Sequence, residues 1–421
     1  MSNICVIGLG FVGLPAAIMF ANNGHTVHGV DIDESIIDAV MRGEAGGDEP
    51  RLTDLLQHAL DVGNFRASAS TSVADAFVIA VPTPVRGDRT PDMTFVINAC
   101  RSIVDHLKPG DLVVVESTIP PGATANEITA TLQEGGLKAG TDFSLAYCPE
   151  RVLPGNIVKE IVENDRIIGG IDERSTKSAV DLYGSVVTGN LRESDAATAE
   201  MVKLAENTYR DVNIALANSL ANMSEITGVN IWNVVEMANL HPRVNIHQPG
   251  PGVGGHCIPV DPWFLVNADE SSSKLIRLAR EVNDGQPRIM ANLAIEALTG
   301  IQRANAALLG ASYKPDVKDA RESPTADLSA HLTNAGITVS VADPHVTEFV
   351  PAIVPLYDAI QDADIIIVVV KHEEYLQIHP QAIAGLMRTR TVLDTTNALD
   401  RDKWESSGFT FLRYGEGRKT C

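Results

Sequence analysis

Residues 4–13 of the chain read ICVIGLGFVG, and an apolar pattern with helical spacing follows them. The four apolar residues predict a buried strand, and the G-x-G-x-x-G pattern predicts a tight turn into a helix. Gly8 would permit the turn, Gly10 would let the backbone approach a pyrophosphate, and Gly13 would let the helix pack on the strand. This stretch therefore predicts the first strand, turn and helix of a dinucleotide-binding fold.

A second apolar run, residues 26–30, ends at Asp31, about 20 residues beyond the glycines. A carboxylate at that distance accepts hydrogen bonds from the 2′-hydroxyl of a ribose, which favours NAD over NADP. The glycine pattern alone is a weak signal, but the strand before it, the helix after it and Asp31 together make it strong. We therefore expect NAD as the cofactor.

Three further strands are predicted at residues 76–81, 112–115 and 143–147. Ligands of open parallel sheets bind beyond the carboxyl ends of the strands, so side chains that follow these runs face the same cleft. These side chains are Thr83, Thr118, Glu150 and Arg151. The alternative is that the threonines only cap strand ends and that Glu150 and Arg151 form an exposed ion pair of little energetic value.

Length and charge limit the possible functions. The 421 residues predict two or three domains, and the hydrophobic fraction of 44% is normal for a globular protein. The formal net charge of −21 disfavours nucleic acids and anionic membranes as partners. An anionic substrate would need a local basic pocket.

The five cysteines are scattered and form no C-x-x-C pair, which is typical of a reduced intracellular protein and indicates neither a disulfide framework nor a zinc site. The longest apolar run, residues 365–370, is too short to cross a bilayer, and the N-terminus has no features of a secretory signal. We therefore expect a cytoplasmic protein.

A long helix is predicted from residue 194 to about residue 227, because this stretch lacks glycine and proline and has apolar residues at helical spacing. Lys203, Asn207 and Arg210 share one face of it. They are either a solvated face or a row of donors for an oxyanion and a phosphate. The length of the helix suggests a dimer interface, and a second helix is predicted at residues 274–299.

Residues 249–264 read PGPGVGGHCIPVDPWF. Prolines fix φ and glycines permit positive φ, so this composition predicts a rigid, shaped loop that a ligand can approach closely. The loop holds the thiol of Cys257 next to His256 and four residues before Asp261. Cys257 is either a buried structural cysteine or, as we favour, a thiolate nucleophile.

Strands at residues 306–310, 338–342, 364–370 and 391–393 alternate with helical segments and predict a second parallel, doubly wound sheet. It lacks the glycine pattern of the first. Lys314 and Arg321 lie in its first loop region, where the phosphates of a nucleotide could bind, unless they are chance surface charges. The fold class is therefore α/β, with two Rossmann-like doubly wound parallel-sheet domains joined by a long central helix.

Taken together, these motifs resemble the UDP-glucose/GDP-mannose dehydrogenases, which are four-electron oxidases of nucleotide sugars. The resemblance spans nearly the whole chain and rests on residues 8–13, 81–84, 116–118, 149–155, 203–212, 254–262 and 321–324. Within the family, residues 241–246 (HPRVNI) followed by residues 249–264 are most similar to the enzymes that oxidise UDP-N-acetyl-D-mannosamine. Phe11 stands where many relatives have tyrosine.

This resemblance implies three domains: an NAD-binding domain at residues 1–193, a central helical domain with the cysteine loop and a dimer interface at 194–300, and a UDP-sugar-binding domain at 301–421. It implies catalytic roles for Cys257, Lys203, Asn207, Asp261, Glu150 and Thr118. The implied cofactor contacts are Gly8, Gly10, Phe11, Val12, Gly13, Asp31, Thr83, Thr118 and Arg321. The implied substrate contacts are Arg151, Val152, Lys203, Asn207, Arg210, His241, Arg243, Gly254, Tyr313 and Lys314. His241 and Arg243 are often supplied across a dimer.

The resemblance implies NAD-dependent oxidation of UDP-N-acetyl-D-mannosamine at C6 to the uronate, through a thiohemiacetal and a thioester on Cys257, without a metal. It also implies a UDP-N-acetylhexosamine as the substrate, a homodimer or higher oligomer, and a place in polysaccharide biosynthesis. One alternative is the same chemistry on UDP-N-acetylglucosamine or UDP-glucose. Two others are a two-electron hydroxyacid or polyol dehydrogenase, and a non-catalytic protein that binds nucleotide sugars.

Overall fold

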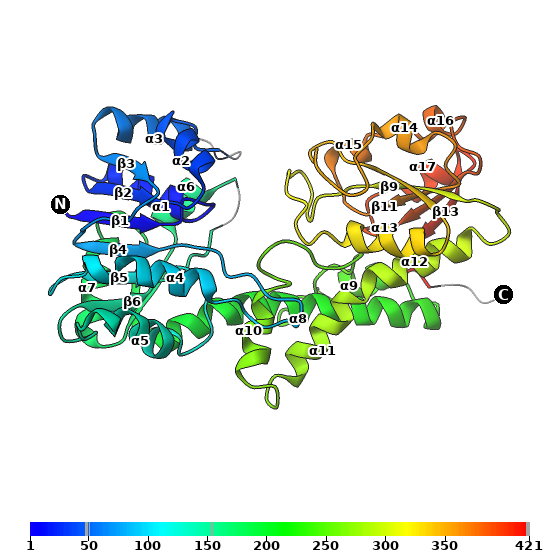
Figure 1. The fold of residues 1–421 in the computed structure, drawn as a ribbon. Coiled ribbons are helices and arrows are strands. Elements are labelled where there is room, and N and C mark those ends of the chain that lie inside the picture. The colour runs from blue at the N-terminus through cyan, green and yellow to red at the C-terminus, as the bar shows by residue number, and fades with distance from the viewer. Residues whose placement is uncertain (47–48, 50, 153–154, 418–421) are drawn as a thin grey trace. The chain divides into compact units, whose positions relative to one another are not determined.

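The computed structural model describes residues 1–46, 49, 51–152 and 155–417. The chain folds into two compact units (Figure 1). Unit 1 comprises residues 1–206 and 263–270, and unit 2 comprises residues 207–262 and 271–421. Leu153 and Pro154 of the motif at 149–155, and Cys421, lie outside the described residues.

Unit 1 is built on an eight-stranded sheet with the order β3-β2-β1-β4-β5-β6-β7-β8, in which only the β6–β7 pair is antiparallel. The strand order reverses direction at β1, which lies between β2 and β4, and this is the point at which doubly wound sheets bind ligands. The strands are β1 (Asn3–Ile7), β2 (Thr26–Val30), β3 (Phe65–Ser68), β4 (Ala76–Ile79), β5 (Leu112–Val115), β6 (Ser144–Tyr147), β7 (Arg166–Gly170) and β8 (Leu191–Asp195).

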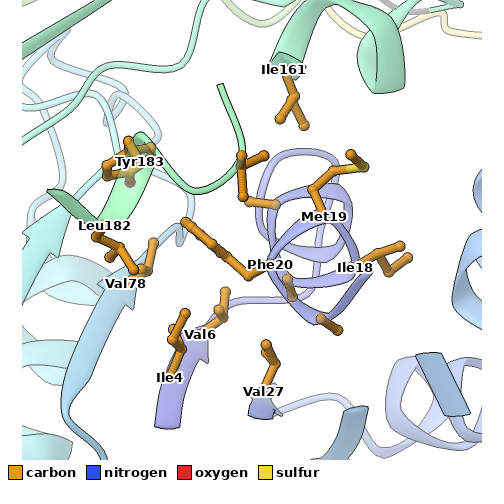
Figure 2. Packing of buried hydrophobic residues seen from close by; sticks show 14 of the residues in the cluster. Ile4, Val6, Ile18, Met19, Phe20, Val27, Val78, Ile161, Leu182 and Tyr183 are labelled. Carbon is orange, nitrogen blue, oxygen red and sulfur yellow. The ribbon is translucent and has the colours of Figure 1, made fainter. Parts of the chain in front are cut away.

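Helices cover both faces of this sheet because alternate residues of each buried strand face opposite sides. One face packs on α1 (Gly13–Asn22), α3 (Leu52–Asp61), α6 (Ile157–Glu163) and α7 (Glu173–Tyr183). Figure 2 shows this core, in which Phe20 of α1 lies between strand residues and Leu182 and Tyr183 of α7. The other face packs on α4 (Thr94–Ile103) and α5 (Thr129–Leu132). The helix α2 (Glu34–Met41) follows β2.

Unit 2 contains a five-stranded, entirely parallel sheet with the order β10-β9-β11-β12-β13. The strands are β9 (Asn305–Leu309), β10 (Thr338–Ala342), β11 (Ile365–Val368), β12 (Thr391–Asp394) and β13 (Thr410–Arg413). Its first face packs on α9 (Ile231–Ala238), α12 (Gln286–Ala297) and α13 (Pro324–Asn334). Its second face packs on α14 (Leu356–Ile360), α15 (Glu373–Leu376), α16 (Pro380–Ile383) and α17 (Arg401–Glu405) (Figure 1).

The long helix α8 runs from Ala196 to Thr227, so its first part belongs to unit 1 and the rest to unit 2. The helix α10 (Asp261–Ala268) follows the cysteine loop. The helix predicted at residues 274–299 is two helices, α11 (Lys274–Asp284) and α12, because the chain turns at Gly285 and α12 restarts with Pro287 in its first turn.

These observations confirm the predicted α/β class with two doubly wound sheets and a long helix. Strands β3, β7, β8 and β13 were not predicted. Strand β8 lies at the edge of its sheet and has the polar sequence LRESD with mostly exposed side chains, so it lacks the apolar run that marks a buried strand.

A cluster of buried ionisable side chains lies at the carboxyl ends of β5 and β6. The Glu116 carboxylate accepts a hydrogen bond from the hydroxyl of Tyr183 at 2.5 Å, and no described residue forms a hydrogen bond with its other oxygen, Oε2. The guanidinium of Arg166 lies 3.9 Å from Glu116 and 2.7 Å from the carboxylate of Glu150. Burial raises the pKa of Glu116 to about 7, although Arg166 partly opposes the shift.

We predict that Glu116→Gln flattens the pH dependence of stability. Between pH 4.5 and about 7 the folded protein retains a proton on Glu116 that the unfolded chain releases. The free energy of unfolding of the natural chain should therefore fall as pH rises through this window, by at most about 1.4 kcal/mol per pH unit for one proton. Urea unfolding at pH 5 and pH 8 measures the effect.

The free energy of unfolding of the glutamine variant minus that of the natural chain should be larger at pH 8 than at pH 5. The exposed Glu134→Gln is the matched control and should leave this difference unchanged. Equal pH slopes for the natural chain and Glu116→Gln would contradict the prediction.

Candidate functional site

The turn between β1 and α1 has the shape that its glycines predicted. Gly8 has φ of +94°, and a Cβ there would lie 2.5 Å from the carbonyl oxygen of Ala80. A Cβ at Gly13 would lie 1.9 Å from the carbonyl oxygen of Gly8. A Cβ at Gly10 would meet no atom within 4 Å, so the backbone there faces open space. Both Gly10 and the next residue, Phe11, are exposed.

Asp31 is fixed beside this turn. One carboxylate oxygen accepts a hydrogen bond from the backbone N–H of Leu9 at 2.8 Å, and the other accepts one from Asp33 at 3.0 Å. These bonds orient the carboxylate at the end of β2 and leave lone pairs for a ribose hydroxyl. The open backbone at Gly10, the start of α1 at Gly13 and this carboxylate together suit the pyrophosphate and ribose of NAD.

Thr83 and Thr118 follow β4 and β5, and the structure brings them together. The hydroxyl of Thr83 donates a hydrogen bond of 2.6 Å to the carbonyl oxygen of Thr118, and both residues are partly buried. The hydroxyl of Thr83 therefore links the two strand ends.

Lys203, Glu150 and Arg151 also meet in unit 1. The ammonium of Lys203 donates to the backbone carbonyl of Glu150 at 2.8 Å, and the Glu150 carboxylate pairs with the buried guanidinium of Arg166. The backbone N–H of Arg151 donates to the Glu150 carboxylate at 2.7 Å, while its guanidinium pairs with Glu206 at 2.8 Å. Glu150 is buried and held on two sides, so its orientation is fixed.

Asn207, Arg210 and Asp261 form a second group, in unit 2. The amide nitrogen of Asn207 donates to the carboxylate of Asp261 at 2.5 Å, and both residues are buried. The guanidinium of Arg210 donates to the amide oxygen of Asn207. The three side chains therefore form a chain of polar contacts from α8 to the first residue of α10.

Cys257 lies in the loop before α10 and is partly exposed. Its sulfur is 3.0 Å from Nδ1 of His256, and its carbonyl oxygen accepts from the backbone N–H groups of Val260 and Asp261. The pKa of Arg321 is raised, mainly by a hydrogen bond to Asp319, and the charge of Cys257 is also near enough to contribute. Arg321 therefore lies in the surroundings of the thiol, and its guanidinium is paired with Asp319 at 2.6 Å.

The loop is docked against the segment after β9. A Cβ at Gly254 would lie 2.6 Å from the carbonyl oxygen of Glu322 and 2.8 Å from Cβ of Tyr313, so only glycine fits. The backbone N–H of Gly255 donates to the carbonyl oxygen of Arg321 at 3.0 Å. Gly254 and Tyr313 are therefore in contact, and Arg321 is close by.

A cavity of about 550 Å³ opens beside this docking point in unit 2. Tyr313 and Lys314 line it, as does Lys371, which follows β11. The remaining lining comes from residues at the proline-rich start of the cysteine loop, from the segment after β9, from the residues before Lys371 and from those after β12: Gln248, Pro249, Pro251, Gly252, Ser312, Pro315, Pro324, Val369, Val370, Thr396 and Asn397. Two lysines and several backbone groups at the carboxyl ends of parallel strands suit an anionic nucleotide.

His241 and Arg243 are exposed, and the backbone N–H of Arg243 donates to Nδ1 of His241 at 3.3 Å. Neither is among the described residues that line the cavity. Val152 is partly buried beside the core of unit 1.

Three residues with clear roles were missed by the sequence analysis: Arg166, Glu116 and Lys371. Arg166 comes directly before the apolar residues Ile167 and Ile168 and is the first residue of β7. A charge at the start of a short apolar run was the signal in the sequence that could have pointed to it. Lys371 lies three residues beyond the apolar strand β11. Glu116 belongs to the motif at residues 116–118, but nothing in that motif indicates that its carboxylate is buried.

Comparisons with known proteins agree along the chain. Residues 2–187 match the NAD-binding domain of the UDP-glucose/GDP-mannose dehydrogenase family, residues 197–285 its central domain and residues 307–401 its UDP-binding domain. A UDP-N-acetyl-D-mannosamine dehydrogenase of Methanococcus maripaludis is 43% identical over 99% of this chain and 98% of its own.

Two further relatives are informative. An NDP-N-acetyl-D-galactosaminuronic acid dehydrogenase of Ralstonia solanacearum is 42% identical over 93% of this chain and 95% of its own. The structure of a UDP-D-ManNAc dehydrogenase of Pyrococcus horikoshii superposes with a TM-score of 0.92 at 39% identity, covering 98% of this chain and 99% of that one.

The described helices include none that is both long and apolar enough to cross a membrane. The glycine turn and Asp31 suit NAD, the cavity in unit 2 suits a nucleotide, and the family models cover both parts. The chain belongs to the UDP-glucose/GDP-mannose dehydrogenase family and is an NAD-dependent dehydrogenase of UDP-sugars.

Proposed function

We propose that this enzyme oxidises UDP-N-acetyl-D-mannosamine at C6 to UDP-N-acetyl-D-mannosaminuronate, in two two-electron steps. The observation that carries the proposal is the partly exposed thiol of Cys257, held 3.0 Å from His256 in a rigid loop of an NAD-dependent sugar dehydrogenase. Relatives named for UDP-N-acetyl-D-mannosamine are 43% identical over nearly the full length, which supports this sugar.

The need for a thiol follows from the oxidation levels. The C6 alcohol loses two electrons and two protons to become an aldehyde, whose carbon is trigonal. A second hydride can leave only after a nucleophile makes that carbon tetrahedral. Addition of the Cys257 thiol gives a thiohemiacetal, and loss of a hydride and a proton gives a thioester. Attack by water then releases the carboxylate and a proton and restores the thiol. NAD, when bound, accepts each hydride.

The polar groups of the two units have complementary roles in this proposal. Lys203 and Asn207 donate hydrogen bonds to the oxyanion that develops at C6, and removal of one such donor typically costs about 10²–10³ in rate. Asp261, hydrogen-bonded to Asn207, accepts a proton from the alcohol or from the thiol. Because Lys203 belongs to unit 1 and Cys257 to unit 2, their joint action on one carbon is part of the proposal.

Glu150 and Thr118 act on the water of the hydrolytic step. Glu150 is buried and oriented by Arg166, so its carboxylate can hold a water molecule and take its proton as the thioester is attacked. Thr118 offers a hydroxyl at the neighbouring strand end. Arg151, Val152, Arg210 and Gly254 complete the substrate contacts, and Arg321 and Thr83 contact the cofactor.

The nucleotide of the substrate occupies the cavity of unit 2 in this proposal. Lys314 and Lys371 neutralise the diphosphate, and Tyr313 packs against the base or the sugar. We also propose three domains, at residues 1–193, 194–300 and 301–421, and the three matched family domains support this division. From the family resemblance we further propose a cytoplasmic location and a place in polysaccharide biosynthesis.

A second candidate substrate has direct support from the comparisons. The Ralstonia relative, named for N-acetyl-D-galactosaminuronic acid, is almost as similar as the mannosamine enzymes. Overall identity therefore does not separate the sugars, since N-acetylmannosamine and N-acetylgalactosamine differ only in configuration at C2 and C4, and a few contacts distinguish them. UDP-N-acetylglucosamine and UDP-glucose remain further alternatives.

We predict two NADH for each molecule of UDP-N-acetyl-D-mannosamine consumed. The assay follows NADH absorbance to completion with limiting sugar, in parallel with UDP-N-acetylglucosamine, UDP-N-acetylgalactosamine and UDP-glucose. The mannosamine should give the highest kcat/KM of the four. A ratio of one NADH per sugar nucleotide would refute the four-electron reaction. A higher kcat/KM with another UDP-sugar would show that this other sugar is the preferred substrate.

Cys257→Ser should lower steady-state turnover by at least about 10³-fold, because a hydroxyl is a far weaker nucleophile than a thiolate. NAD affinity should stay within about twofold, since the glycine turn and Asp31 belong to unit 1. Stopped-flow NADH formation and calorimetric NAD titration measure the two effects. Full NADH production by this variant would rule out the covalent step.

We also propose that the enzyme is a homodimer that uses α8. Apolar side chains on this helix are exposed at a spacing of seven residues, with exposed fractions of 59% for Tyr209, 49% for Leu216 and 59% for Met223. A seven-residue spacing places them on one face, and an unpaired apolar stripe of this kind is typical of an interface. His241 and Arg243, exposed in one chain, would complete the site of the partner.

Leu216→Glu combined with Met223→Glu should halve the mass measured by light scattering, because two charges per chain would be buried in the interface. Ile32→Glu, another exposed apolar position but in unit 1, is the matched control and should keep the mass of the natural chain. A natural chain that is already monomeric at micromolar concentration would refute the dimer.

A further inference from the structure

Four potential metal ligands converge at the carboxyl edge of the sheet in unit 2. Asp316 follows β9, His345 follows β10, and His372 and Glu374 follow β11. These three strands are neighbours in the order β10-β9-β11, so the segments that leave their carboxyl ends meet. One nitrogen or oxygen atom of each residue lies within 4.8 Å of those of the other three.

The separations suit a four-coordinate ion. Nε2 of His345 lies 3.4 Å from the Glu374 carboxylate and 3.8 Å from the Asp316 carboxylate, and Nδ1 of His372 lies 3.5 Å from the same oxygen of Asp316. Ligands at zinc–nitrogen and zinc–oxygen distances of about 2.0–2.2 Å from a tetrahedral centre are roughly 3.3–3.6 Å apart. Small side-chain adjustments would therefore bring the four atoms to one ion.

The tautomer of His372 is already set for metal binding. Its Nδ1 lies 3.0 Å from the backbone N–H of Asp316, which can only donate, so Nδ1 is the unprotonated nitrogen. The proton is therefore on Nε2, which lies 3.0 Å from the carboxylate of Asp343. A carboxylate that orients a histidine in this way, with the other nitrogen turned to the ion, is the usual outer shell of a protein zinc site.

Asp343 is fixed in place for this role. Its carboxylate accepts hydrogen bonds from the backbone N–H groups of Ala311, His345 and Val346 and contacts Nε2 of His372. Both oxygens are occupied by these donors and that of Ser312. Asp343 therefore positions His372 and is not itself a ligand.

A second observation concerns His345. Its Nε2 atom is buried and has no hydrogen-bond partner among the described residues, although the carboxylates of Asp316 and Glu374 lie within 4 Å. Asp316 and Glu374 give the cluster two carboxylates. A divalent cation would supply the missing bond to His345 and neutralise both carboxylates.

We propose that Asp316, His345, His372 and Glu374 form a binding site for Zn²⁺ or a divalent transition metal of similar preference. Two imidazoles and two carboxylates suit Zn²⁺ better than Mg²⁺ or Ca²⁺, which prefer oxygen ligands. Binding exchanges the hydrogen bond between Asp316 N–H and His372 for a bond to the ion. Asp316 and His372 directly neighbour Pro315 and Lys371 of the cavity wall, so the ion would brace the loops that hold Lys314 and Lys371.

The test is calorimetric titration of the chelator-treated full chain with ZnCl₂, in the Cys257→Ser background so that the exposed thiol cannot capture the metal. We expect one Zn²⁺ per chain and a higher melting temperature. Co²⁺ should bind at the same stoichiometry and give the intense visible absorption of a tetrahedral centre. A large excess of Mg²⁺ should not displace Zn²⁺.

His345→Gln and Glu374→Gln should each weaken Zn²⁺ binding at least about tenfold and abolish the rise in melting temperature. His379→Gln and Glu373→Gln remove the same groups at nearby exposed positions and should bind Zn²⁺ as the parent does. Melting of each variant without metal checks that it folds. Absence of one-to-one binding, displacement by Mg²⁺, or equal binding by ligand and control variants would overturn the proposal.

Discussion

The fold of unit 1 depends on a close approach of backbone segments that leaves no room for a side chain. A Cβ at Gly13 would lie 1.9 Å from the carbonyl oxygen of Gly8, and one at Gly8 would lie 2.5 Å from that of Ala80. The first residue of α1 is therefore in contact with the end of β1, and Phe20, further along the same helix, reaches the core between the sheet and α7. The same contact leaves open backbone at Gly10, where a phosphate can approach. Core packing and cofactor binding thus have one cause.

The cysteine loop of unit 2 follows the same principle. Gly254 approaches the backbone of Glu322 and the side chain of Tyr313 so closely that a Cβ would overlap both. The loop is thereby fixed to the segment that carries Tyr313 and Lys314, and the thiol lies a short distance along the chain from that anchor. In both units, glycine places a reactive or ligand-binding segment by removing a side chain, and the neighbouring polar groups are oriented by backbone hydrogen bonds.

The sequence predicted the parts of this arrangement that depend on local chemistry. The glycine turn, Asp31 at the end of β2, the long helix and the alternation of strands and helices in unit 2 are all present. The break between α11 and α12 was missed because one glycine and one proline did not outweigh the helical pattern around them. Arg166 and Lys371 were missed because their roles come from the neighbours that the sheet brings to them, and those neighbours are distant in sequence.

Because the protein as a whole is acidic, binding of an anionic nucleotide depends on local cations. A chain with a net charge of −21 repels a nucleotide diphosphate at long range, so the attraction must come from groups within about one Debye length of the phosphates. In unit 2, Lys314 and Lys371 enter the cavity from the ends of two neighbouring strands, β9 and β11. In unit 1, the polarity of α1 supplies partial positive charge without any basic side chain in its first turn. A parallel sheet thus gathers donors at one edge, and this suffices to bind anions to an acidic protein.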